Sequence, residues 1–326
     1  MNKLMTVVAA SVCAVSLSVP AVAAEDASTE KKDAAEAAEA LKEEEEDSKI
    51  FEVGVDFDFL SAYVWRNAIQ NDEMVMQPCV WADWTQLDPF YAGFSVWQNY
   101  DLTDRRRNDL RKGLAETDYN VHVGATAWQN EDEDMSLGVE LGHEWFDNQF
   151  VRRGSGDAYP DSREIYLKAT FDNPFVNVYG QVSWMYEDFG ANKQGVHYEI
   201  GFNKEVEVYD AVTVGVDWNV NFGDGHYLNF LYGGTRSGYD EYGEREYEGS
   251  SAGFGGTTVK LYATWQVTEW FSLGGVIAYT GVLNGAYREA LGDQGDDWWD
   301  YSDENGGNGF YQRDFVWGGL QAKVSF

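Results

Sequence analysis

The stretch FEVGVDFDF, residues 51–59, decides the fold, because its apolar and polar residues alternate without a break. Every odd-numbered position from Phe51 to Phe59 is apolar, and the positions between them hold Glu, Gly or Asp. A period of two sends successive side chains to opposite faces of a β-strand. The stretch therefore predicts a strand with one apolar face and one polar face.

The same alternation recurs along the chain as far as Phe326. Such runs predict twelve strands, at residues 51–66, 73–84, 90–98, 117–128, 135–145, 163–171, 175–186, 195–203, 211–222, 257–267, 270–281 and 315–326. The connections between them alternate between short turns and mostly longer loops rich in Gly, Asp and Asn. An even strand number with this alternation is typical of outer-membrane barrels.

A soluble β-sandwich also alternates, so three further features bear on the choice. Most predicted strands reach the ~9 to 11 residues that a tilted strand needs to cross a bilayer. Aromatic residues gather near strand ends, where the interfacial girdles of a barrel lie. They are Tyr63, Trp65, Trp84, Trp128, Trp145, Trp184, Trp265 and Trp270. The chain also ends on an aromatic residue inside its last strand. We predict an all-β, transmembrane antiparallel up-and-down β-barrel of about twelve strands, with both termini periplasmic.

The N-terminal residues differ in composition from this repeating pattern. Residues 1–24 have a basic start, an apolar stretch and small residues at the end, which predicts a signal peptide that is removed. Residues 25–50 are acidic and rich in Ala and Glu, with no aromatic residue, and we expect a periplasmic spacer there. A short coiled coil or an envelope-binding arm is the alternative. Residues 51–326 form the predicted barrel.

The net charge of −33 narrows the classes of partner. Residues 51–326 alone carry 45 acids against 18 bases, so the excess is not confined to the spacer. Nucleic acid is excluded as an expected partner, because its binding depends on basic surface. Cys79 has no partner within residues 51–326, so no disulfide is expected there.

The polar face of every strand should line the barrel interior. The charged residues predicted to line a pore are Asp56, Asp58, Asp83, Glu140, Glu144, Glu164, Lys168, Glu199, Asp217, Lys260 and Lys323. Acids outnumber lysines, and rings of carboxylates favour cations over anions. The alternative is that these acids only hydrate a polar lumen.

The width of the pore is expected to follow from the number of strands. A barrel of ~8 strands is filled by its own side chains, whereas 16 to 18 strands leave a channel, so twelve predicts a narrow pore. We expect it to be partly closed by the loop at residues 223–256 or the loop at residues 282–314. One loop carries the basic cluster Arg105, Arg106, Arg107 and Arg111, which either folds inward or faces solvent and lipopolysaccharide.

Other functions find less support in the sequence. The acids and aromatics of residues 293–304 raise a surface binder or adhesin, and divalent-cation binding, as alternatives. A barrel hydrolase would need His122 or His197, and neither stands at a telling spacing from a nucleophile. Zinc spacing and phosphate loops are absent from the sequence, so we expect no metal, no cofactor and no enzymatic activity.

Pro78 conflicts with the pattern, because it falls inside a predicted strand of a barrel that has no free edge. We expect a bulge or kink at this position.

Two resemblances follow from short motifs. The C-terminal GLQAKVSF, residues 319–326, resembles the signal that the barrel-assembly machinery recognises, with Phe326 as its last residue. The segment DFLSAYVWR, residues 58–66, continued by Asn71-Asp72 and Gln77-Pro78, resembles the opening of TorF-type putative porins, although Asn67 replaces the glycine usual after the arginine. This resemblance implies an outer-membrane channel of unassigned substrate and no catalytic residues.

These observations predict an outer-membrane, porin-like channel for passive diffusion of small hydrophilic solutes that prefers cations. The expected partners are outer-membrane lipid, lipopolysaccharide, the barrel-assembly machinery and small solutes. A homo-oligomer is left open.

Overall fold

The structure is a computed structural model that divides the chain into two units, Met1–Lys49 and Ile50–Phe326. It describes residues 51–87, 89–103, 113–130, 133–148, 161–187, 194–232, 238–239, 245–246, 252–288 and 314–326. The predicted signal peptide and acidic spacer lie outside the described residues, as do Arg105, Arg106, Arg107, Arg111 and residues 293–304.

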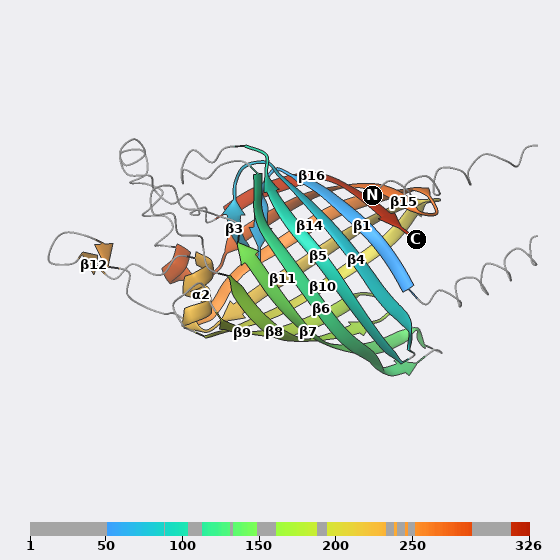
Figure 1. Ribbon diagram of the computed structural model, residues 1–326, viewed down its shortest axis with the longest axis horizontal. Helices are drawn as coiled ribbons and strands as arrows, with labels where there is room; N and C mark the ends of the chain where they lie inside the picture. The colour runs from blue at the N-terminus through green and yellow to red at the C-terminus, as the bar shows by residue number, and fades with distance from the viewer. Residues whose placement is uncertain are drawn as a thin grey trace, which may run out of the picture. The chain divides into compact units, whose positions relative to one another are not determined.

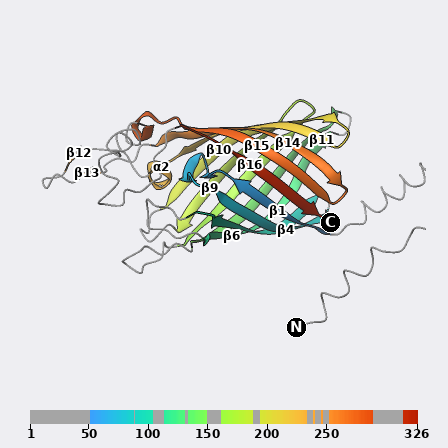
Figure 2. The same ribbon diagram turned by 90° about the horizontal axis from the view of Figure 1, so that it is seen from above.

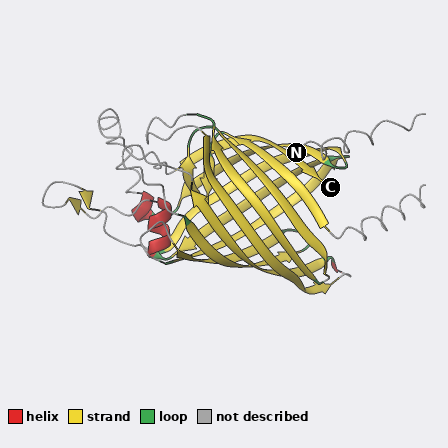
Figure 3. Ribbon diagram, viewed as in Figure 1, coloured by secondary structure: helices red, strands yellow, loops and turns green. Residues whose placement is uncertain are grey.

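Twelve antiparallel strands close into a barrel, which confirms the predicted fold class (Figure 1). They are β1 (Phe51–Leu60), β4 (Val75–Leu87), β5 (Phe90–Asp101), β6 (Gly113–Asn130), β7 (Met135–Asn148), β8 (Ser162–Asp172), β9 (Asn177–Glu187), β10 (Gly195–Tyr209), β11 (Val212–Gly223), β14 (Gly253–Thr268), β15 (Phe271–Val282) and β16 (Asp314–Ser325). Each pairs with its neighbours in sequence, and β1 pairs with β16. Figure 3 shows the tilted strands winding around the wall.

The remaining elements belong to the loops. They are β2 (Tyr63–Trp65), β3 (Ala68–Asn71), α2 (Gly225–Tyr232), β12 (Gly238–Tyr239) and β13 (Arg245–Glu246). None of the helices in the described part of the chain is long and apolar enough to cross a membrane. In the view of Figure 2, α2 lies at one end of the barrel and the C-terminus lies at the other.

The first predicted strand, residues 51–66, is wrong in its second half. β1 ends at Leu60, and the chain then forms the β2–β3 hairpin. Ser61 holds the end of β1 against β16, because its backbone N–H donates to Gly318 O at 2.9 Å and its hydroxyl accepts from Gly318 N–H at 3.1 Å. Tyr63 and Trp65 keep the odd-numbered apolar positions of β1, but Leu60, Ala62 and Val64 are apolar as well, so the strict alternation already ends near the break.

Pro78 lies in β4 without the bulge that we expected. Pairing of β4 with β5 runs from Met76↔Tyr100 to Cys79↔Trp97 in one register and leaves out the two positions between. Because proline has no N–H to donate, its side of the ladder is interrupted and not shifted. The pairing with β1 is retained, with Phe57 opposite Pro78.

The two faces of the wall differ sharply in chemistry. Large apolar side chains are exposed on the outer face, for example Val316 at 63% and Leu320 at 69% of their surface. Contiguous exposed apolar surface on this scale marks an interface with another apolar phase. The inner face carries the carboxylates, amides and tyrosines that bond to one another.

Aromatic residues stand at both ends of the outer face. Six of those predicted there are at least 40% exposed: Trp84, Trp128, Trp145, Trp184, Trp265 and Trp270. Phe326 stacks on Trp270 with ring centroids 6.4 Å apart. The prediction is wrong for Tyr63 and Trp65, which belong to the β2–β3 hairpin and pack inside the barrel.

Several inner tyrosines lie across a glycine on the adjacent strand. The Tyr166 ring lies where a Cβ at Gly142 would stand, and its hydroxyl donates to Glu140 at 2.8 Å. Tyr179 covers Gly201 in the same way and donates to Glu199 at 2.9 Å. The absence of a side chain at these glycines lets each ring lie flat against the wall and reach a carboxylate.

We expect Gly142→Val to displace the Tyr166 ring and lower the free energy of unfolding by about 1–3 kcal/mol, as overpacking does. Urea titration of protein folded into lipid vesicles measures this change. Gly138→Val is the matched control on β7, because the nearest atom to its Cβ would be Thr170 O at 3.9 Å. Equal losses in both variants would show that the tyrosine contact is not the cause.

Candidate functional site

The interior is crossed by the β2–β3 hairpin, which begins directly after β1. Trp65 pairs with Ala68, so Arg66 and Asn67 form a two-residue turn. Both have positive φ, 48° and 63°, as a type I′ turn requires. Asparagine tolerates this conformation, but for arginine it costs about 1–2 kcal/mol. The fold holds Arg66 in this strained conformation against that cost, which points to the contacts of its side chain.

The hairpin reaches opposite sides of the barrel. On one side, the Tyr63 ring packs 5.3 Å from Trp97 of β5, and the Trp65 ring packs 5.3 Å from Phe146 of β7. On the other side, Asn67 Nδ2 donates to Gly256 O of β14 at 3.1 Å. Four strands separate β7 from β14 in one direction around the wall, and six separate them in the other. The hairpin therefore spans the lumen.

Arg66 is the central contact of this arrangement. Its guanidinium donates to both oxygens of Glu164, at 2.8 Å to Oε2, and lies 3.5 Å from Glu144 Oε2. It also donates to the hydroxyl of Tyr227 in α2. The Arg66 and Glu164 side chains are 8% and 0% exposed. Burial lowers the pKa of Arg66, but Glu164 and Glu144 raise it, and the net direction is upward. The guanidinium is therefore a fixed positive charge.

The need for that charge follows from the register. Glu144 of β7 and Glu164 of β8 are direct cross-strand partners. Like charges in this position destabilise a sheet. Arg66 is placed against both carboxylates and compensates their repulsion.

α2 packs over the hairpin at the loop end of the barrel. Asp224 caps the helix, since its carboxylate accepts from the Tyr227 N–H at 2.8 Å and from Val196 N–H at 2.8 Å. The helix buries Tyr227 and Leu228 in a cluster with Ala68 of the hairpin. α2 belongs to the loop at residues 223–256, and the prediction that this loop partly closes the lumen stays a prediction, because most of its other residues lie outside the described ones. Most of the other predicted loop, residues 282–314, lies outside the described residues.

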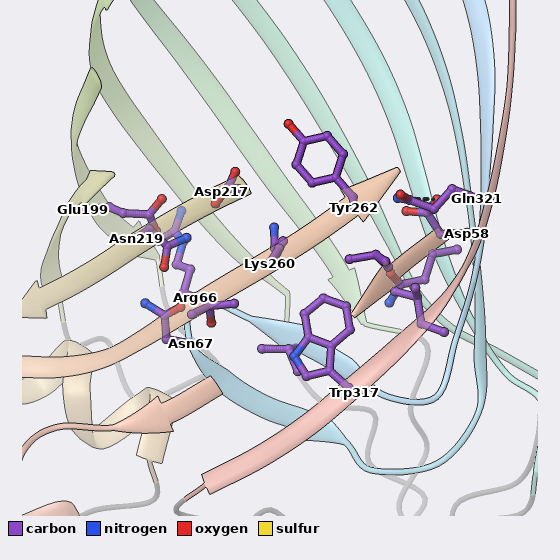
Figure 4. Close-up of a pocket in the computed structure, with 15 residues that line it drawn as sticks. Asp58, Arg66, Asn67, Glu199, Asp217, Asn219, Lys260, Tyr262, Trp317 and Gln321 are labelled. Carbon is purple, nitrogen blue, oxygen red and sulfur yellow. Dashed lines mark hydrogen bonds between the residues drawn. The ribbon is translucent and has the colours of Figure 1, made fainter. Parts of the chain in front are cut away.

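A cavity of about 390 Å³ remains beside the hairpin (Figure 4). Its walls come from β1, β4, β10, β11, β14, β15 and β16, and from Arg66 and Asn67 of the turn. Charged residues from four strands line it, namely Asp58, Glu199, Asp217 and Lys260. Open space of this size, lined mainly by polar side chains, can hold a small molecule.

The register places all of the predicted pore residues on one face of the strands. Asp56 pairs with Lys323, Glu140 with Lys168, and Asp217 with Lys260. Each interior lysine therefore stands opposite one acid. The other predicted acids have no lysine opposite them: Asp58, Asp83, Glu144, Glu164 and Glu199.

Several charged residues of the interior were not among those predicted from the sequence, including Arg66, Asp101, Glu116 and Asp118. Arg66 was placed in a wall strand, and the inward-facing Glu116 and Asp118 of β6 were not included, although they follow the alternation of that strand. The signal for Arg66 was local. The two-residue Arg66-Asn67 turn between short apolar runs is a hairpin pattern, and asparagine is a residue that favours such turns.

The histidines show no catalytic arrangement in the described residues. His122 lies 3.6 Å from Asp83 and 3.1 Å from Asn120 Oδ1. His197 is cross-strand to Ser183, but neither ring nitrogen forms a hydrogen bond, and Ser183 Oγ accepts from Gln181. Within the described residues, no group of three or more His, Cys, Asp or Glu is arranged to hold a metal ion.

A closed antiparallel barrel with an even number of strands, an apolar outer face and a polar interior is the architecture of outer-membrane proteins. We assign this chain to that class and to the outer membrane.

No protein-family model and no curated protein matches the sequence. Similar solved structures include the COG4313 outer membrane channel from Pseudomonas putida F1, with 10% identity, a TM-score of 0.47 and coverage of 85% of this chain and 95% of that chain. The KdgM porin has 7% identity and a TM-score of 0.40, with coverage of 84% and 99%. The Salmonella typhi outer membrane phospholipase has 10% identity and a TM-score of 0.40, with coverage of 84% and 90%. These likenesses carry no conclusion about what the chain transports or binds, and the resemblance to TorF-type putative porins stays a prediction.

We expect Arg66→Gln to lower the free energy of unfolding by about 3–5 kcal/mol, because it leaves the buried Glu164 without its counter-charge. Urea titration in lipid vesicles measures the loss. Adding Glu164→Gln should recover part of it.

The matched control is Arg163→Gln. Arg163 pairs with Glu187 at 2.9 Å, but the two side chains are 36% and 50% exposed. Exposed pairs contribute about 0–1 kcal/mol, so a loss as large as that of Arg66→Gln would refute a special role for the interior pair.

Proposed function

We propose that this protein is an outer-membrane, porin-like channel for passive diffusion of small hydrophilic solutes, with a preference for cations. The observation that carries the proposal is the excess of carboxylates on the inner face of a closed barrel whose interior retains open space. In such a lumen, solutes would pass a wall of fixed charges.

The cation preference rests on the imbalance of those charges. The three interior lysines each stand opposite an acid, and Arg66 is bound by Glu164. Asp58, Asp83 and Glu199 remain without a basic cross-strand partner. An excess of fixed negative charge raises the local concentration of cations and lowers that of anions.

The size limit rests on the hairpin. It spans the lumen from β7 to β14, and α2 packs on it, so the passage beside it is narrow. Solutes of the size of the 390 Å³ cavity are the natural cargo. In this proposal the hairpin is also the constriction that limits conductance.

The proposal includes an orientation and partners. We place the end with short turns, Phe51 and Phe326 in the periplasm, and the long loops at the cell surface. Phe326 continues the pairing of the last strand, since its N–H donates to Val53 O at 2.9 Å. The barrel-assembly machinery would read this strand, and lipid and lipopolysaccharide would cover the outer face. A homo-oligomer is compatible with this orientation.

The other candidate functions lack a supporting observation in the described residues. A surface binder or adhesin would use loops that lie outside the described residues. A hydrolase would need a nucleophile beside a histidine, and Ser183 and His197 do not bond to each other.

Neutralising Asp56, Asp58 and Glu140 together, by Asp→Asn and Glu→Gln, should reduce the preference for K⁺ over Cl⁻. The reason is that these inner-face carboxylates supply the field that attracts cations. The reversal potential in a planar bilayer under a KCl gradient measures the preference.

The control variant removes the same number of charges at Glu133, Asp210 and Glu269, in the short turns. It should leave the reversal potential close to that of the native protein. An unchanged potential in the inner-face variant would contradict the proposed selectivity mechanism.

Arg66→Gln should also raise the single-channel conductance, because the hairpin loses the ion pair that holds it across the lumen. A disulfide between Asn67→Cys and Gly256→Cys, in a Cys79→Ser background, provides the causal test. A Cβ at Gly256 would lie 2.8 Å from Asn67 Cβ, close to disulfide distance after a small adjustment.

In the oxidised form, this disulfide should return the conductance of the Arg66→Gln protein to the native value, and a reducing agent should raise it again. The same conductance in the oxidised and reduced forms would show that the hairpin is not the constriction.

A further inference from the structure

Two side chains that line the cavity each hold a buried acceptor without a donor. Asp217 Oδ1 and Asn219 Oδ1 are shielded from solvent and accept no hydrogen bond from the protein. They stand two residues apart on β11, so their side chains share the inner face. Buried acceptors of this kind are costly unless a donor satisfies them, which points to a donor that comes from outside the protein.

A positive charge lies beside them. Lys260 of β14 is the direct cross-strand partner of Asp217 and lines the same cavity (Figure 4). The second cation at the cavity, Arg66, is already occupied by Glu164 and Tyr227. Lys260 is therefore the cationic group that faces both the acceptors of β11 and the open space.

The rest of the lining is partly apolar. Trp317 of β16, Val276 of β15 and Leu60 of β1 contribute to it, and the Trp317 indole N–H is satisfied by Thr280 at 3.0 Å. The ring of Trp317 thus offers apolar surface without an unmet polar group. An aliphatic side chain fits such a wall.

We propose that this cavity binds free aliphatic amino acids. The ammonium group donates to Asp217 Oδ1 and Asn219 Oδ1, the carboxylate pairs with Lys260, and the side chain packs toward Trp317 and Val276. The inference rests on the proposed channel function, because it names the solute class for the same lumen.

A zwitterion fits better than either single charge. A simple cation would satisfy Asp217 but would approach the ammonium of Lys260, and a simple anion would meet Asp217 and Glu199. In an amino acid, opposite charges lie on adjacent groups, as Asp217 and Lys260 lie on adjacent strands.

Equilibrium dialysis of the refolded full-length protein with labelled L-leucine tests binding directly. Two analogues each delete one charge of leucine: 4-methylpentanoate lacks the ammonium and 3-methylbutylamine lacks the carboxylate. Each is expected to bind about tenfold or more weakly, because it loses a charge-assisted hydrogen bond. Binding of either analogue as tight as that of leucine overturns the proposal, whatever the variants do.

Asp217→Asn and Lys260→Gln should each weaken leucine binding by about tenfold or more. The matched controls are Asp83→Asn and Lys168→Gln, which remove the same charges from strands outside the cavity lining, and they should leave binding unchanged. Comparison of heated and unheated samples on a detergent gel shows which variants are folded.

Reduction of the K⁺ current by leucine is the second readout, and it separates the two proposals. Leucine binding by a protein that passes no current would overturn the channel and support the site. A K⁺ current that leucine leaves unchanged, together with no binding in dialysis, would overturn the site and leave the channel standing.

Discussion

The pairing of β1 with β16 is the contact on which the rest of the structure depends. Hydrocarbon offers no hydrogen-bond partner to a backbone N–H or C=O, so a sheet in a membrane must close on itself. Seven residue pairs from Gly54↔Ser325 to Leu60↔Gly319 make that closure, and Phe326 extends it by bonding to Val53. Once the barrel is closed, the alternation of each strand decides which side chains face the interior and which face outward. Most apolar side chains of the wall face out, and most of its charged side chains are enclosed together in the interior.

Enclosure creates the electrostatic problem that the hairpin solves. Glu144 of β7 and Glu164 of β8 are direct cross-strand partners, and Asp118 lies nearby on β6. A lysine on a neighbouring strand could have compensated the charge of one of them, as Lys168 stands opposite Glu140. The chain instead brings Arg66 from a turn with strained backbone dihedrals, and one planar group serves two carboxylates and a tyrosine. The hairpin that carries this counter-charge is a separate two-stranded sheet and takes no part in the ladder that closes the barrel.

Most of the wall was predictable because its determinants are local. Alternation gave the twelve strands to within a few residues at most ends and placed Asp56, Asp58 and Lys260 on one face. The hairpin was not predictable in this way. The Arg66-Asn67 turn is a local signal, but the place of the hairpin inside the barrel depends on where Tyr63 and Trp65 pack, against Trp97 and Phe146 far along the chain. The cavity depends in turn on the hairpin, and no residue spacing encodes it.

The interior carboxylates divide into two groups with different physical consequences. Glu140, Glu164 and Glu199 accept hydrogen bonds from tyrosines or Arg66, so their negative charge is partly used within the protein. Asp217 keeps a buried oxygen without a donor, although Lys260 stands on the adjacent strand. Charges of the first group stabilise the wall and the hairpin, and removing a partner from one of them should cost stability. In the proposed channel, charges of both groups contribute to the field of the lumen, but a carboxylate oxygen without a donor can also bond to what enters it. The same residue type therefore has different physical consequences according to the donors that the closed barrel places beside it.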